Sequence, residues 1–146
     1  MTKQELSQCL SKLYRKSLSL KEKGEIPVSA CLLFDDGTFI LEGNKVEETD
    51  NPLSHAEIMV LEKGFREKNT RYLNNAVMIV SLEPCLMCLG AIIKAGIKEL
   101  YYVLDDPKLG SLSHYHTHTD DRLMITRIDD DRFLPLFKDF FSSLRR

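Results

Sequence analysis

Two short stretches of the chain carry side chains that can bind a metal ion and move protons. His55 and Glu57 lie in the first, HAE at 55–57, and Cys85 and Cys88 lie in the second, PCLMC at 84–88. Cysteines at i and i+3 share one face of a helix, and a helix N-terminus favours thiolates. Two thiolates and one imidazole leave one position of a tetrahedral Zn²⁺ open for water. Glu57, beside that position, is placed to shuttle protons.

The cysteine pair has other interpretations, because C-x-x-C alone also occurs in disulfides, redox couples, structural metal sites and pairs of buried thiols. The chain has only four cysteines, the other two being Cys9 and Cys31, whereas a small secreted disulfide scaffold would carry more. No second Cys or His pair stands at zinc-finger spacing. A thioredoxin-type redox site would follow the first strand and would give His55 and Glu57 no task. The cysteine pair is therefore best interpreted as half of a catalytic zinc site.

Composition places the chain among globular proteins of one domain. Its 146 residues are the usual size of a single domain, so we expect residues 1–146 to form one. The net charge of −2 provides no overall positive field for nucleic acid, although a local basic patch is compatible with it. There is no apolar run of the roughly 18 residues needed to span a membrane, and no signal-peptide pattern. We therefore expect a cytoplasmic protein that does not bind membranes.

Hydrophobic periodicity predicts alternating strands and helices. Helices are expected at 3–22, 54–68, 85–96 and 129–146, with Ser54 as the N-cap of the second, and 45–52 as a loop. Strands are expected at 28–34, 38–44, 76–82, 98–106 and 123–128. This order predicts an α/β fold, a three-layer α-β-α sandwich with a five-stranded mixed sheet flanked by helices. Both motifs then fall at strand-to-helix junctions, where ligands of such sheets collect.

Together, the motifs H-x-E and P-C-x-x-C resemble those of the zinc-dependent nucleoside and nucleobase deaminases, the cytidine/deoxycytidylate deaminase superfamily. The resemblance covers nearly the whole chain and implies a cytidine deaminase-like fold. Within the superfamily, the chain resembles the bacterial tRNA-specific adenosine deaminases. The similar segments are EIPVSA at 25–30, EGN at 42–44, NPLSHAEIMVL, VSLEPCLMCLGAII and the final FFSSLRR.

This resemblance implies a role for each site residue. His55, Cys85 and Cys88 would hold one Zn²⁺ per chain, with water as the fourth ligand, and Glu57 would be the catalytic proton carrier. Substrate contacts are implied for four further residues. Asn44 would hydrogen-bond the base or sugar, Val28 and Leu82 would line the base pocket, and the backbone N–H of Ala56, with that of Cys85, would bind the new carbonyl oxygen.

The substrate is harder to predict than the reaction. The resemblance implies deamination of adenosine to inosine at the tRNA wobble position, with the tRNA anticodon arm as partner. The acidic segment 47–50 would repel phosphate, and Asp105 stands where those enzymes usually carry Arg. A free nucleobase or nucleoside deaminase of cytosine, guanine or cytidine type is therefore the alternative. The cations that favour RNA are Lys94, Lys98, Lys108, Arg145 and Arg146.

The oligomeric state of the protein and the role of the segment from His114 to His118 each allow more than one hypothesis. A homodimer is the default expectation, because members of this superfamily are usually oligomeric. A non-catalytic, zinc-stabilised RNA-binding or assembly subunit is an alternative. Such subunits typically lose the catalytic glutamate, whereas this chain keeps it as Glu57. The segment from His114 to His118 contains three histidines, which suggests a surface loop, with a second metal site or stacking of Tyr115 on RNA bases as alternatives.

Overall fold

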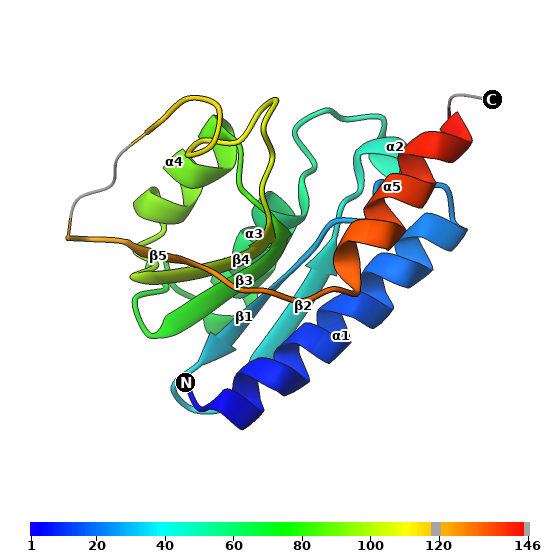
Figure 1. Ribbon diagram of the computed structural model, residues 1–146. Helices are drawn as coiled ribbons and strands as arrows, with labels where there is room; N and C mark the ends of the chain where they lie inside the picture. Colours follow the sequence, from blue (N-terminus) through cyan, green and yellow to red (C-terminus); the bar gives the residue numbers. More distant parts are fainter. Residues whose placement is uncertain (118–120, 145–146) are drawn as a thin grey trace.

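A computed structural model describes residues 1–117 and 121–144. The chain forms a five-stranded sheet in the order β2-β1-β3-β4-β5, with helices on both faces (Figure 1). The strands are β1 (Ser29–Phe34), β2 (Phe39–Gly43), β3 (Ala76–Leu82), β4 (Glu99–Leu104) and β5 (Met124–Arg127). The helices are α1 (Lys3–Glu22), α2 (Val46–Thr49), α3 (Ala56–Lys68), α4 (Leu86–Lys94) and α5 (Phe133–Leu144). The predicted three-layer α/β fold is confirmed, apart from the additional helix α2.

The sheet is mixed because its first connection is a hairpin and the later ones are crossovers. β1 pairs antiparallel with both β2 and β3, whereas β3, β4 and β5 run parallel to one another. Parallel neighbours need a crossover connection, and α4 makes it between β3 and β4. The carboxyl ends of β3 and β4 therefore meet at one edge of the sheet, next to the start of α4.

Two apolar layers follow from the period-2 alternation of the strands. Ala30, Leu32 and Phe34 of β1 pack in the layer shared with α3 and α4. Cys31 of the same strand packs in the opposite layer with Leu13 of α1 and Phe133 of α5. Figure 1 shows α1 and α5 side by side on one face of the sheet, with α3 and α4 on the other. The two motif-bearing helices thus share one face.

The segment between β2 and α3 differs from its prediction. Residues 45–52, expected as a loop, contain the one-turn helix α2, in which the N–H groups of Glu47 and Glu48 donate to the buried carboxylate of Glu25. Ser54 is not the N-cap of α3, because its hydroxyl accepts a hydrogen bond from Thr49 at 3.0 Å. His55 is the N-cap instead, with extended backbone angles of φ −67° and ψ 153°.

Candidate metal centre and active site

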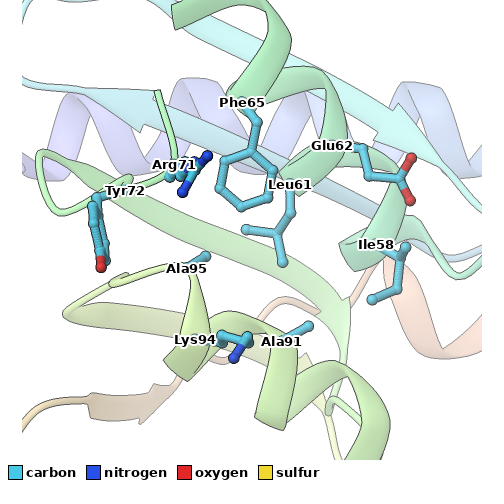
Figure 2. Close-up of a pocket in the computed structure, with 9 residues that line it drawn as sticks. All are labelled: Ile58, Leu61, Glu62, Phe65, Arg71, Tyr72, Ala91, Lys94 and Ala95. Atoms are coloured by element: carbon cyan, nitrogen blue, oxygen red, sulfur yellow. The ribbon is translucent and has the colours of Figure 1, made fainter. Parts of the chain in front are cut away.

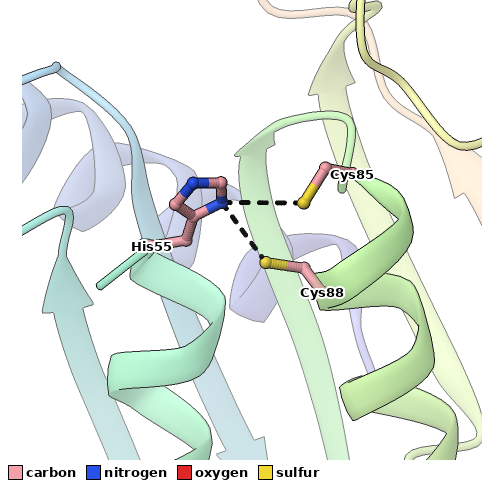
Figure 3. Close-up of side chains that lie close together, drawn as sticks. All are labelled: His55, Cys85 and Cys88. Atoms are coloured by element: carbon pink, nitrogen blue, oxygen red, sulfur yellow. Dashed lines mark hydrogen bonds between the residues drawn. The ribbon is translucent and has the colours of Figure 1, made fainter. Parts of the chain in front are cut away.

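The three predicted metal ligands come together where α3 and α4 begin. His55 is the N-cap residue of α3, Cys85 is the N-cap residue of α4, and Cys88 lies in the first turn of α4. The Nδ1 atom of His55 is 3.7 Å from the Sγ of Cys85 and 3.5 Å from the Sγ of Cys88 (Figure 3). Neither side chain makes an N-cap hydrogen bond, and the two face each other across the starts of the helices.

This donor set fits a zinc ion. Zn–S bonds of about 2.3 Å and Zn–N bonds of about 2.0–2.1 Å at tetrahedral angles place the nitrogen and sulfur atoms about 3.6 Å apart. The observed separations of 3.7 and 3.5 Å match that spacing, and the three ligand atoms all lie within 4.8 Å of one another. Three protein ligands are also the number found in catalytic zinc sites, which keep a position for water or substrate.

The local electrostatics favour a thiolate at Cys85. A hydrogen bond from the thiol of Cys88, assisted by His55, lowers the pKa of Cys85 to about 4. The same hydrogen bond, together with burial, raises the pKa of Cys88. His55 shares in this network, since its hydrogen bond with Cys85 raises the pKa of the imidazole. Cys85 is therefore a thiolate at neutral pH, whereas a metal ion bound here would have to displace the proton of Cys88.

Glu57 is buried beside the three ligands. Its side chain is 4% exposed, in the first turn of α3 and two residues after His55. Burial raises the pKa of its carboxyl to about 7, against the opposing effects of its own backbone N–H and of His55. A carboxyl with a pKa near 7 can accept and return a proton at neutral pH, which general acid–base chemistry needs.

The residues predicted to contact substrate lie in or beside the apolar layer that α3 covers. Val28 and Ala56 are buried in the apolar layer between the sheet and α3, and half-buried Leu82 packs against that layer at the end of β3. Asn44 is 5% exposed and donates its backbone N–H to the carbonyl of Val28 at 2.9 Å. Its Oδ1 accepts the N–H of Val46 at 2.9 Å. The amide NH₂ of Asn44 has no partner among the described residues, so it is available as a donor.

Two buried acids next to these residues escaped prediction. Glu25 and Glu83 are 5% and 2% exposed, and each accepts hydrogen bonds from backbone amides distant in the chain. The only available signal was that Glu25 lies in the segment EIPVSA and Glu83 in the segment VSLEPCLMCLGAII. Their partners depend on the folded chain and leave no periodic pattern.

The remaining loop histidines do not form a second cluster among the described residues, where His55, Cys85 and Cys88 are the only group of three metal-type side chains. His114 packs edge-on against Tyr115, with ring centroids 4.7 Å apart, and its Nδ1 lies 3.1 Å from the carbonyl of Pro107. His118 lies outside the described residues. The second metal site is therefore without support from His114 and His116.

An open hollow of about 440 Å³ lies between α3 and α4 (Figure 2). Its lining is mainly apolar, includes Glu62, Arg71 and Lys94, and contains neither Glu57 nor any of the three predicted metal ligands. The lining residues are Ile58, Leu61, Glu62, Phe65, Arg71, Tyr72, Ala91, Lys94 and Ala95. It is a surface feature of the helix pair rather than the reaction site.

No helix among the described residues is long and apolar enough to cross a membrane.

The family model for the cytidine and deoxycytidylate deaminase zinc-binding region matches residues 1–104. The chain belongs to this family, and with its His-Cys-Cys cluster it is a zinc-dependent hydrolytic deaminase. The predicted superfamily, enzyme class and zinc cofactor are confirmed.

Among curated proteins, the chain is similar to enzymes named tRNA-specific adenosine deaminase. It is 30% identical to the one from Aquifex aeolicus over 85% of this chain and 85% of the relative. It is 38% identical to the one from Haemophilus influenzae over 77% of this chain and 68% of the relative.

Solved structures agree with the fold. One comes from work on A-to-I editing by tRNA:A34 deaminases at the wobble position of transfer RNA. It aligns with a TM-score of 0.76 at 29% identity, over 85% of this chain and 99% of that one. A guanine deaminase from Nitrosomonas europaea aligns with a TM-score of 0.70 at 20% identity, over 90% of this chain and 80% of that one. The second match shows the shared fold alone.

Proposed function

We propose that the 146-residue chain is a single catalytic domain that deaminates adenosine to inosine at the wobble position of tRNA. The observation that carries the reaction is the convergence of His55, Cys85 and Cys88 beside the buried carboxyl of Glu57. The choice of tRNA rests on relatives of that name that align over most of both chains. A tRNA substrate also implies a cytoplasmic location.

His55, Cys85 and Cys88 would hold one zinc ion, which activates a water molecule near neutral pH. Glu57 would carry one proton of the attacking water to the ring nitrogen, where it stays in inosine, and a second proton, from the newly added hydroxyl group, to the leaving amine. Water adds to C6 of adenine, the C6–N bond breaks, and ammonia leaves as the carbonyl of inosine forms. The backbone N–H groups of Ala56 and Cys85, at the starts of two helices, would donate to that oxygen.

Three side chains would position the base. Val28 and Leu82 would enclose it on the apolar side, and the free amide NH₂ of Asn44 would donate to an acceptor on the base or ribose. Because the Oδ1 of Asn44 already accepts the N–H of Val46, the amide presents a donor and not an acceptor to the substrate.

Free nucleobases or nucleosides are the second candidate substrates. Glu47, Glu48 and Asp50 are exposed on and after α2, three to six residues beyond Asn44. Their negative charges would oppose the approach of an RNA backbone but would not affect the binding of a neutral base.

We also propose a homodimer formed through the face shared by α3 and α4. The hollow between these helices exposes apolar side chains, and Tyr72 at its edge is 66% exposed. Exposed apolar patches mark association sites, and two-fold dimers are the commonest oligomers. Sedimentation of the chain at micromolar concentration measures its oligomeric state directly, and a monomer at that concentration would contradict the proposal.

The test compares two sets of substrates offered to the zinc-loaded protein. One is an anticodon stem-loop with adenosine at position 34, and the other is a panel of free bases and nucleosides, with ammonia and inosine as products. We expect turnover of the stem-loop only, and a loss of about 10²–10⁴-fold in Glu57→Ala at unchanged zinc content. Turnover of a free base alone would replace tRNA by the second candidate, and full activity of Glu57→Ala would refute the mechanism.

A further inference from the structure

Glu83 is a buried acid that the deamination chemistry does not use. It follows the end of β3 and directly precedes Pro84 and Cys85, and only 2% of it is exposed. A buried carboxylate is costly unless hydrogen bonds replace its lost hydration. Here the replacement comes from the segment 106–113, which follows β4.

Four donors of that segment converge on the carboxylate of Glu83. The N–H groups of Leu112 and Ser113 both donate to Oε2 at 2.8 Å. The N–H of Asp106 donates to Oε1 at 3.1 Å, and the hydroxyl of Ser113 donates to the same oxygen. One side chain therefore gathers both ends of the segment.

The same segment also grips the two residues after Glu83. Ser111 donates to the carbonyl of Pro84 through its N–H at 3.0 Å and through its hydroxyl at 2.8 Å. Gly110 forms an isolated antiparallel β-bridge with Cys85. The chain at 110–113 thus runs along 83–85, almost residue for residue.

Gly110 is required for this close approach. A Cβ atom there would overlap Oε2 of Glu83 and would lie 2.5 Å from the carbonyl oxygen of Asp106. Neither group can retreat easily, because the carboxylate is held by four donors and the carbonyl belongs to the backbone. An alanine at this position would push the segment away from Glu83 and Cys85.

We propose that Glu83 is a positioning residue for the metal centre, which holds the Cys85 thiol in place by tying its backbone to the segment 106–113. Cys85 needs such support because it is the N-cap of α4, with extended backbone angles of φ −74° and ψ 175°, and its side-chain direction follows from them. Cys88 lies within the helix and is held by it. The inference rests on the zinc-binding role proposed above for Cys85.

The direct test is the rate at which zinc leaves the zinc-loaded, full-length protein for a chromogenic chelator. Glu83→Gln places an amide NH₂ against backbone donors, and Gly110→Ala displaces the same segment without altering the carboxylate. Groups that orient metal ligands change metal affinity about 10–100-fold. We expect both variants to release zinc at least about tenfold faster. Ser113→Ala, which removes one of the four donors, should have a smaller effect.

Gly90→Ala is the matched control, because a Cβ at this position in α4 meets no atom within 4 Å. We expect its zinc release to equal that of the unmodified chain. Hydrogen exchange at the amides of Leu112 and Ser113, and the urea midpoint in saturating zinc, report on the segment and on global stability. Faster exchange with unchanged zinc release in Glu83→Gln and Gly110→Ala would overturn the inference. If Glu83→Gln does not fold, Gly110→Ala and Ser113→Ala decide it.

These outcomes are separable from the proposed function. The variants could release zinc in the expected order while the protein deaminates no RNA. That result would support the positioning role of Glu83 and contradict the proposed tRNA substrate. A chain that binds no zinc would reject both.

Discussion

The segment after Asn44 and the segment after β4 are held in a similar way but act on different parts of the site. Glu25 accepts the N–H groups of Glu47 and Glu48 at 3.1 and 3.0 Å, which anchors α2. Glu83 accepts those of Leu112 and Ser113. The first anchor lies next to Asn44, on the substrate side, and the second lies next to Cys85, on the metal side. With the roles proposed for Asn44 and Cys85, separate buried carboxylates would support substrate recognition and metal retention.

The largest effect on the substrate side should come from Asn44→Ala. Loss of its amide donor removes one hydrogen bond to the substrate, which contributes about 0.5–1.5 kcal/mol. We expect kcat/KM for the anticodon stem-loop to fall up to about tenfold at unchanged zinc content.

Asn51→Ala is a suitable control for Asn44→Ala, because Asn51 also accepts a backbone N–H two residues ahead, from Leu53 at 2.9 Å. Its kcat/KM should stay within about twofold of the unmodified chain, since a surface change of this kind has little effect. Loss of zinc in Asn44→Ala would mean that the two sides of the site are not separate.

A smaller effect is expected from Glu25→Gln. Its amide NH₂ would face backbone donors and loosen α2, so hydrogen exchange at the amides of Glu47 and Glu48 should accelerate. Because Asn44 also binds the first amide of α2, kcat/KM should fall by roughly threefold, less than a full hydrogen bond is worth. The chelator assay should find zinc release unchanged. Zinc release from Glu25→Gln as fast as from Glu83→Gln would contradict the assignment of the two carboxylates to different parts of the site.

Much of the fold and the metal cluster could be predicted because their signals are local. The continuous apolar runs around Leu32 and Met78 mark strands with two buried faces, and both residues are fully buried in the layer under α3. His55, Cys85 and Cys88 stand in short motifs at strand-to-helix junctions, so the topology alone brings them to one edge of the sheet.

The supporting residues could not be predicted because their partners are remote. Glu25 binds amides 22 and 23 residues away, and Glu83 binds amides 29 and 30 residues away. Such pairs exist only after the strands have assembled. Ser54 shows the opposite failure, since its spacing to Glu57 matches a capping box while its hydroxyl is engaged by Thr49. The capping pattern was overridden by another local hydrogen bond, from a residue five positions earlier.

The central claim is that two helix N-termini build a one-zinc deaminase centre, and metal content measured together with activity tests it most directly. Native mass spectrometry and inosine formation should be compared for the unmodified chain, Cys88→Ser and Cys9→Ala, the last being a buried cysteine outside the cluster. The account predicts one zinc per chain and inosine from the anticodon stem-loop for the unmodified chain and Cys9→Ala, and neither for Cys88→Ser. One zinc and an unchanged rate in Cys88→Ser would contradict it.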